Sequence, residues 1–237
     1  MPFNIYVGYD SREKIASDVC EFSLKKNSSI KINIKLLKKK NLENKKLLYR
    51  QDDTLSSTEF TFSRFLVPYL NNYKGWAIFC DCDFLWLNDI KTLLDQRNNK
   101  FAVMCVQHDY KPKSKVKMDG KKQLIYPRKN WSSMVMWNCE HPENKKINLN
   151  MVNTQTGKFL HRFGWLDDKF IGKIDTSWNW LVGWYNLSES KNVNAVHFTE
   201  GGPWFENYKN CDFSDLWKKY KDEMKSMNEK KVIKKNF

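Results

Sequence analysis

Two aspartates, Asp81 and Asp83, interrupt an apolar run over residues 76–87. A run without Gly or Pro is typical of a buried strand, and alternate side chains of a strand share a face, so both carboxylates would point the same way. Ionised carboxylates placed side by side at the end of a buried strand repel each other and lose hydration. A divalent cation removes both penalties, because carboxylate oxygens are preferred ligands of Mg²⁺ and Mn²⁺. The alternative is that the strand has already ended and both acids are solvated.

A histidine far along the chain is a candidate third ligand. His197 lies in a short apolar segment, residues 195–198, that reads as a strand. A lone histidine after a strand is more often structural than a ligand. Beside an Asp-x-Asp pair, its imidazole lone pair makes it a metal ligand candidate.

The elements that precede this pair predict where it lies. Apolar alternation over residues 3–7 and 30–34 predicts two strands, and helical spacing over 12–24 predicts a helix between them. This βαβ unit predicts a parallel sheet, in which ligands bind beyond the carboxyl ends of the strands. Residues 8–11 and 81–83 are therefore expected at the same sheet edge.

The rest of the chain continues the α/β pattern. A core helix is expected over 58–70, and it carries Arg64, which is either a phosphate or nucleotide contact or a surface residue. Further elements are predicted as a short helix from Asp89, strands at 101–106 and 131–137, and partial helix over 150–163. The fold expected is a single α/β domain with a mixed, mainly parallel sheet flanked by helices.

The chain is strongly basic. Its 237 residues carry a formal net charge of +14, which favours anionic partners such as nucleotide phosphates, nucleic acid or a membrane surface. Biased use of Lys and Asn, as from an A+T-rich coding sequence, is a competing cause. The basic loop over 111–129 is either a solvent-facing segment or a lid over an anionic substrate.

The last part of the chain reads as a Lys-rich amphipathic helix from Asp212 and a disordered tail over 230–237. Four of its apolar side chains face either the protein body or a membrane surface: Leu216, Trp217, Tyr220 and Met224.

Cysteine usage and the absence of other motifs narrow the class of protein. The six cysteines lie mostly in apolar segments without Cys-x-x-Cys spacing, which favours reduced thiols and a cytoplasmic location. Neither a signal peptide nor a membrane-spanning apolar stretch is visible in the sequence. The glycine-rich, P-loop and Gly-x-Ser-x-Gly signatures of other enzyme classes are also missing.

Tryptophan is dense between residues 163 and 185, where several aspartates also occur. Indoles and carboxylates in one segment suggest a wall on which a sugar or base stacks. Core packing is the competing explanation for these tryptophans: Trp165, Trp178, Trp180 and Trp184.

Taken in order, these pieces resemble a GT-A-fold, nucleotide-sugar-dependent glycosyltransferase, closest to the glycogenin-like family 8, over about residues 3–208. The resemblance rests on four segments: Gly8-Tyr9-Asp10, Thr61-Phe62-Ser63-Arg64-Phe65, Asp81-Cys82-Asp83, and His197-Phe198-Thr199-Glu200-Gly201-Gly202-Pro203-Trp204.

The resemblance implies roles for these residues. In that family the Asp-x-Asp and the late histidine bind Mn²⁺, which holds the diphosphate of a UDP-sugar; Mg²⁺ is the alternative ion. The metal ligands would thus be Asp81, Asp83 and His197. Contacts to the nucleotide or its phosphates would come from Gly8, Tyr9, Asp10, Arg64, Gly201 and Gly202. Asp167 and Asp168 match the family's Asp-Gln pair near the reaction centre.

Three departures from the family pattern affect the site. The lysine that grips the pyrophosphate after the histidine is missing, and Arg128, Lys129 or Lys209 are candidate replacements. A small Asn-x-Gly turn is replaced by residues 131–133, and Asp168 stands where Gln is usual.

The sequence therefore predicts a metal-dependent hexosyltransferase, retaining by resemblance, with a catalytic domain over 1–210 and a basic helix and tail over 211–237. The acceptor is an unknown glycan, lipid or protein, and the C-terminal helix is a candidate for peripheral membrane contact. Two alternatives stay open. A Mg²⁺-dependent nucleotidyltransferase would need a third nearby carboxylate, and a nucleic-acid-binding protein would need a reading helix, which the dispersed lysines do not suggest.

Overall fold

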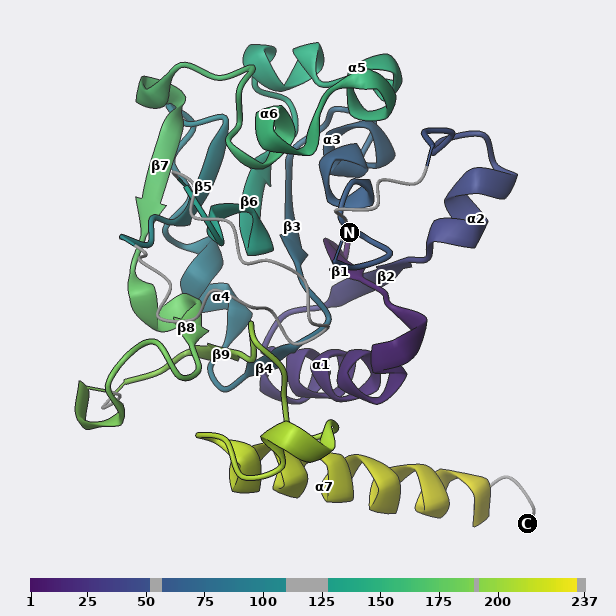
Figure 1. The fold of residues 1–237 in the computed structure, drawn as a ribbon, viewed down its shortest axis with the longest axis vertical. Coiled ribbons are helices and arrows are strands. Elements are labelled where there is room, and N and C mark those ends of the chain that lie inside the picture. Colours follow the sequence, from purple (N-terminus) through teal and green to yellow (C-terminus); the bar gives the residue numbers. More distant parts are fainter. Residues whose placement is uncertain (52–56, 110–127, 190–191, 234–237) are drawn as a thin grey trace.

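The computed structural model describes residues 1–51, 57–109, 128–189 and 192–233. Its centre is a six-stranded sheet with the strand order β2-β1-β3-β6-β5-β7 (Figure 1). The strands are β1 (Phe3–Gly8), β2 (Ile32–Leu37), β3 (Trp76–Cys80), β5 (Val103–Val106), β6 (Met134–Asn138) and β7 (Ile171–Ile174). Only β6 among them runs antiparallel to its neighbours. The mixed, mainly parallel sheet confirms the fold class expected from the sequence.

A second, three-stranded sheet lies beside the first. Its order is β4-β9-β8, with β4 (Phe84–Trp86), β9 (Ala195–His197) and β8 (Trp180–Leu181). Phe84 pairs with His197 across β4 and β9. This pairing brings residue 197 alongside the chain that has just left β3.

Helices cover the sheet on both sides (Figure 1). The longest are α1 (Lys14–Asn27), which follows the 3₁₀ turn η1 (Ser11–Glu13), and α7 (Ser214–Ile233), and these two helices contact each other. The shorter helices are α2 (Lys39–Asn44), α3 (Val67–Leu70), α4 (Ile90–Leu94), α5 (Leu149–Thr154) and α6 (Gly157–His161). No helix in the described ranges is both long and apolar enough to cross a bilayer.

The apolar run over 76–87 does not form one strand. It forms β3 and β4, which belong to different sheets, and the aspartates lie in the turn between them. The amide of Asp81 donates a 2.9 Å hydrogen bond to the carbonyl of Ser133, so the chain leaves the main sheet there. The aspartates are thus placed by a change of sheet rather than by strand alternation.

The helix expected over 58–70 is also different. The segment forms turns, the 3₁₀ helix η2 (Ser63–Leu66) and then α3, which has Pro68 in its first turn. Proline is tolerated there because the first turn of a helix has no internal acceptors for its amides. Pro68 therefore belongs to the start of a helix and not to the end of one.

The apolar face of α7 packs on the protein body. Trp217 and Tyr220 are buried in a cluster with Val19 of α1, and the Phe22 ring meets the Tyr220 ring edge-on at 6.3 Å. Residues 230–233 continue α7, so the expectation of a disordered tail is wrong for them. The described residues do not include 234–237 or 110–127, and the second of these ranges contains most of the predicted basic loop.

This packing makes a stability prediction. Trp217→Ala lowers the free energy of unfolding by about 3–5 kcal/mol, because it removes a buried indole between α7 and α1. Met227→Ala, on the exposed side of the same helix, changes it by less than about 0.5 kcal/mol. Urea denaturation followed by circular dichroism measures both; equal effects would show that α7 is not docked through Trp217.

Candidate metal and nucleotide site

The carboxyl ends of β1 and β3 meet at one edge of the main sheet. The strands are parallel, and Val7 of β1 is level with Cys80 of β3. Asp10 and Asp81 follow these strands directly, so the sequence-based expectation that both segments share an edge is confirmed.

Three candidate metal ligands converge at this edge. One ligand atom from each of Asp81, Asp83 and His197 lies within 4.8 Å of the others. The His197 ring nitrogen Nε2 is 3.4 Å from Oδ1 of Asp83. The sequence predicted these three residues as ligands, and the structure brings them together.

The ring of His197 is held in a fixed orientation. Its Nδ1 lies 2.9 Å from the amide oxygen of Asn179, and an amide oxygen can only accept, so Nδ1 carries the proton. The Asn179 amide nitrogen in turn donates to Ser133 Oγ at 2.9 Å. The imidazole also stacks on Phe84 at 4.5 Å between centroids. Nε2 is thereby directed at the aspartates, where it can offer its lone pair to a metal ion, and second-sphere hydrogen bonds orient metal-binding histidines in the same way.

Arg64 supplies a buried positive charge beside the cluster. Its Nη1 lies 2.9 Å from Oδ1 of Asp81 and donates a 3.0 Å hydrogen bond to the carbonyl of Ser132. The guanidinium thus partly compensates one of the two carboxylates. Its position fits a group that would also meet a phosphate held at the cluster.

The electrostatics of the edge are those of crowded, buried acids. Burial raises the pKa of Asp81 to about 7, and the negative charge of Asp83 adds to this shift. The charges of Arg64 and His197 act in the opposite direction, but they do not cancel it. Glu13, on the adjacent turn after β1, is also buried, and burial together with the charge of Asp83 raises its pKa to about 8. Ionisation of these carboxyls is therefore unfavourable in the metal-free site, and a bound cation would favour it.

The donor set fits a divalent metal ion. Oδ1 of Asp81 and Oδ1 of Asp83 are buried, and among the described residues each is approached by one nitrogen, Arg64 Nη1 or His197 Nε2, without a well-aligned hydrogen bond. Two ligands of one Mg²⁺ ion lie at most about 4.2 Å apart, so small side-chain adjustments would bring all three groups onto one ion. Two carboxylates and one neutral imidazole suit Mn²⁺ or Mg²⁺.

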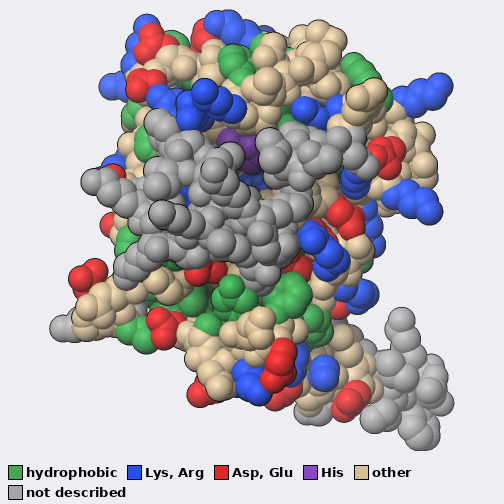
Figure 2. Space-filling model, viewed as in Figure 1, with side chains coloured by type: hydrophobic (Ala, Val, Ile, Leu, Met, Phe, Trp, Pro, Cys, Tyr) green, Lys and Arg blue, Asp and Glu red, His purple; other side chains and the backbone are tan. Residues whose placement is uncertain are grey.

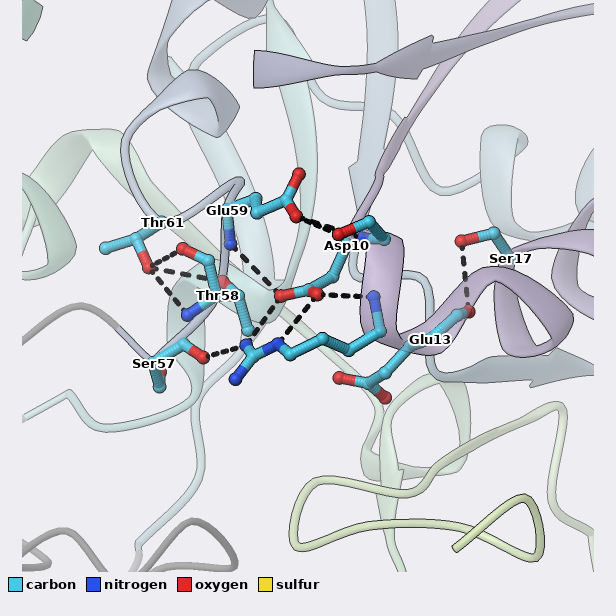
Figure 3. Close-up of polar contacts among 9 residues, drawn as sticks. Asp10, Glu13, Ser17, Ser57, Thr58, Glu59 and Thr61 are labelled. Carbon is cyan, nitrogen blue, oxygen red and sulfur yellow. Dashed lines mark hydrogen bonds and ion pairs between the residues drawn. The ribbon is translucent and has the colours of Figure 1, made fainter. Parts of the chain in front are cut away.

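The predicted nucleotide residues after β1 are already engaged within the protein. Oδ1 of Asp10 accepts from the backbone amide and Nε of Arg12, and Oδ2 accepts from Arg12 Nη2 and the amide of Glu59 (Figure 3). Although burial opposes them, these bonds hold the pKa of Asp10 below its ordinary value. A β-carbon on Gly8 would come within 2.5 Å of the Phe60 ring. Tyr9 lies under Lys38, whose Nζ is 4.6 Å from its ring centroid.

The Gly-Gly-Pro-Trp segment after β9 has a packing role. Trp204 covers Gly202 so closely that a β-carbon there would lie 2.1 Å from the indole. The same indole contacts Trp217 of α7 at 5.2 Å between centroids. Gly201 is buried with φ of +133°, a conformation that side chains avoid. This segment therefore links the end of β9 to α7.

The three candidate substitutes for the missing lysine differ in their surroundings. Arg128 pairs with Asp168 and donates to the carbonyl of Arg162, and Lys209 pairs with Glu206 on an exposed turn. Lys129 is buried. Which of the three replaces the missing lysine stays a prediction.

Asp167 and Asp168 lie at the beginning of β7, whereas the metal candidates follow the ends of the parallel strands. Ile171, the first residue of β7, pairs with Val103 of β5. Val103 and Ala77 of β3 both pair with the same residue of β6, so the start of β7 is level with the start of β3. Asp167 caps the short η5 (Asp168–Phe170) and bonds Lys169, and the Asp168 side chain is 83% exposed. The structure does not bring them into the three-residue cluster, and their catalytic role stays a prediction.

The expected stacking wall is mostly core. Trp165, Trp178 and Trp180 are buried, and the Trp165 ring stacks on Trp137 at 6.1 Å. Only Trp184 of the four is partly exposed. Packing between the sheets and the loops after β6 explains the other three.

Several residues of the site were not anticipated from the sequence. Asn179 follows β7, and Glu13 follows β1, so both come after strands that end at this edge. His108, two residues beyond β5, is buried there as well. The signal available was their position just after a predicted parallel strand, which is the same signal that marked Asp81.

Asn179 can be tested as the support of His197. Asn179→Leu lowers Mn²⁺ affinity by about 10- to 100-fold, because the imidazole loses its orienting acceptor. Isothermal titration calorimetry with MnCl₂ measures the change. Asn99→Leu, which removes an exposed amide near the opposite end of β3, serves as control; equal Mn²⁺ affinity in wild type and Asn179→Leu would contradict the orienting role.

The titration of Asp81 is a second test. In the metal-free protein its carboxyl protonates with a midpoint near pH 7, since burial raises its pKa to about 7. Mg²⁺ binds only the deprotonated form, so saturating Mg²⁺ moves the midpoint to lower pH. Carboxyl ¹³C NMR, with the signal assigned from Asp81→Asn, follows both titrations. A metal-free midpoint near that of a free carboxyl, about 4, would refute the burial argument.

Known proteins with related sequence or structure were compared with the chain. No family model matches it. The bacterial glycosyltransferase GlyE of Streptococcus pneumoniae TIGR4 superposes with a TM-score of 0.63 at 11% identity; the alignment covers 98% of this chain but only 64% of GlyE. The galactosyltransferase LgtC gives 0.57 at 10% identity over 93% of this chain and 96% of LgtC, and mouse xyloside xylosyltransferase 1 gives 0.55 at 12% identity over 86% and 100%.

These structural similarities establish the GT-A type of fold, which is the fold that the sequence resemblance implied. A much closer relative in sequence is Protein CDI of Arabidopsis thaliana, which is 52% identical over 234 residues, covering 98% of this chain and 90% of that protein. The chain therefore belongs to the family of Protein CDI.

Proposed function

We propose that the protein is a metal-dependent glycosyltransferase that moves a hexose from a nucleotide-diphosphate sugar, UDP-hexose in the first instance, to a glycan, lipid or protein acceptor. The observation that carries the proposal is the cluster of Asp81, Asp83 and His197 at the carboxyl edge of the sheet. The fold shared with GlyE, LgtC and xyloside xylosyltransferase 1 supports it, since each of these is a glycosyltransferase. A glycogenin-like relationship and retention of anomeric configuration are part of the proposal.

In this proposal the three clustered side chains hold a divalent cation, Mn²⁺ or Mg²⁺. When bound, such an ion supplies positive charge that stabilises the leaving diphosphate. Arg64 lies beside Asp81 and adds a second, fixed positive charge for a phosphate. His197 keeps its orientation through Asn179, so the site is organised before the substrate arrives.

The remaining predicted residues have proposed roles around this centre. Tyr9 and the backbone at Gly8 lie beside the β1 end of the edge and would contact the base and ribose, while the backbone at Gly201 and Gly202 follows β9. Asp10 acts through Arg12, because both of its carboxylate oxygens are bonded. Asp167 and Asp168 would approach a donor sugar from the segment before β7, where Asp168 is paired with Arg128.

Nucleic-acid binding is less well supported by the surface. On the face drawn in Figure 2, Lys and Arg side chains intermingle with Asp and Glu over the described residues. Several lysines are paired with neighbouring acids, as in Lys14–Asp18, Lys25–Glu21 and Lys91–Asp95. A nucleic-acid site would instead favour a concentrated basic stripe.

Metal-dependent nucleotide binding tests the proposal directly. Asp83→Ala abolishes Mn²⁺-dependent UDP binding, measured by isothermal titration calorimetry, because the cation loses one of its three protein ligands. Asp95→Ala, at an exposed carboxylate paired with Lys91, retains binding. UDP affinity in Mn²⁺ that is unchanged by Asp83→Ala would refute the metal assignment.

Donor choice follows from a screen of UDP-glucose, UDP-galactose, UDP-N-acetylglucosamine and GDP-mannose for Mn²⁺-dependent hydrolysis. The anomeric form of the first product, read by ¹H NMR, tests retention. Release of pyrophosphate rather than a nucleoside diphosphate would favour the nucleotidyltransferase alternative.

A further inference from the structure

A buried histidine at the same sheet edge has one ring nitrogen without a hydrogen-bond partner in the described part of the chain. His108 is 5% exposed, and its buried Nε2 forms no hydrogen bond with the residues that the structure describes. Its other ring nitrogen, Nδ1, lies 2.5 Å from the hydroxyl of Tyr185. A histidine buried only for structural reasons normally has both nitrogens satisfied. The missing hydrogen bond at Nε2 therefore points to a ligand.

The position of His108 places it with the metal candidates. Cys105 of β5 and Phe79 of β3 pair with the same residue of β6, Val135, so the ends of β5 and β3 are level with each other. His108 follows β5 at the same edge of the sheet at which Asp81 and Asp83 follow β3. Its carbonyl accepts a 3.1 Å hydrogen bond from Nε1 of Trp131. Trp131 directly precedes Ser132 and Ser133, whose carbonyls bind Arg64 and Asp81.

Tyr185 ties this histidine to the second sheet. It follows β8, in which Leu181 pairs with His197, and its ring packs against Trp180 at 4.9 Å between centroids. The contact between His108 and Tyr185 thus bridges the end of β5 and the end of β8. Each of these ends belongs to a sheet that supplies a metal candidate, β3 being followed by Asp81 and β9 ending at His197.

The chemistry of the pair favours a neutral hydrogen-bond donor at Nε2. Burial, with a smaller contribution from the charge of His197, lowers the pKa of His108 to about 3, and burial raises the pKa of Tyr185 to about 12. Both groups are therefore uncharged near neutral pH. A phenol donates more readily than it accepts, so its proton lies toward Nδ1 and the imidazole proton is on Nε2.

A neutral donor suits a neutral acceptor. An anionic phosphate would favour the protonated imidazole, which the surroundings of His108 oppose. A carbohydrate hydroxyl has lone pairs and no charge, and it is the group that a nucleotide sugar or its acceptor would bring next to the diphosphate. We propose that Nε2 of His108, positioned by Tyr185, binds a sugar hydroxyl of the transferred hexose or of the acceptor. This inference rests on the proposed glycosyltransferase function.

The first test compares UDP with UDP-hexoses in the presence of Mn²⁺. His108→Phe keeps a ring of similar size but removes the donor, so UDP-hexose affinity falls about tenfold or more while UDP affinity is retained. Isothermal titration calorimetry measures both, and circular dichroism confirms folding. His141→Phe is the matched control, because His141 follows the opposite end of β6 and leaves both affinities unchanged.

The source of the hydroxyl is distinguished by a second arm. If it belongs to the acceptor, His108→Phe leaves UDP-hexose affinity and donor hydrolysis intact but slows transfer to a panel of methyl hexosides about tenfold or more. Either pattern supports the inference. Equal binding and equal transfer in wild type and variant overturn it while leaving the glycosyltransferase proposal in place.

The positioning role of Tyr185 has its own readout. In the wild type, ¹⁵N-resolved NMR of the His108 ring shows the proton on Nε2. Tyr185→Phe allows both tautomers and weakens sugar discrimination less than His108→Phe does. A proton found on Nδ1 in the wild type overturns the assignment of the donor. If the wild type binds neither UDP nor any nucleotide sugar, the proposed function itself fails, and this inference fails with it.

Discussion

Two carboxylates are held close together at a buried sheet edge, and much of the surrounding structure compensates for that repulsion. Asp81 and Asp83 lie in a turn between two sheets, where burial removes most of their hydration. The guanidinium of Arg64 contacts Asp81, and the imidazole of His197 contacts Asp83. The two carboxylate oxygens that meet these groups are buried and lack a well-aligned hydrogen bond within the described residues, so a cation would complete the compensation. Burying two carboxylates in this way destabilises the folded protein, which indicates that the site serves a function.

The arrangement depends on the change of sheet after Cys80. Because β3 belongs to the large sheet and β4 to the small one, the turn between them is open to elements from both. Pairing of β4 with β9 brings His197 into the site, and pairing of β8 with β9 brings the loop that carries Tyr185. The loop before β6 supplies the carbonyls and the serine that hold Arg64, Asp81 and Asn179. Four separate parts of the chain therefore meet around one pair of acids.

The regions that depart from the glycogenin-like pattern have structural explanations of their own. Trp204 occupies the space over Gly202 and packs on Trp217, so the segment after β9 anchors the C-terminal helix. The side chains of α7 that the sequence left free to face a membrane are used for this contact: Trp217 and Tyr220 are buried on the protein body. Most of the clustered tryptophans are likewise part of the core. Apolar content alone could not separate these packing roles from ligand binding.

The sequence by itself determined the α/β class, the parallel βαβ start and the metal candidates, because strand periodicity and residue chemistry are local properties. It did not determine that β3 ends at Cys80, that residues 58–70 avoid one long helix, or that Asp10 is fully engaged by Arg12. Those outcomes depend on partners distant in sequence, such as Ser133 for Asp81 and Glu59 for Asp10. Only the tertiary structure decided which polar atoms stay unpaired once such partners are satisfied. For this reason His108 and Asn179 become site residues only through the fold, whereas residue type and order were enough to indicate Asp81, Asp83 and His197.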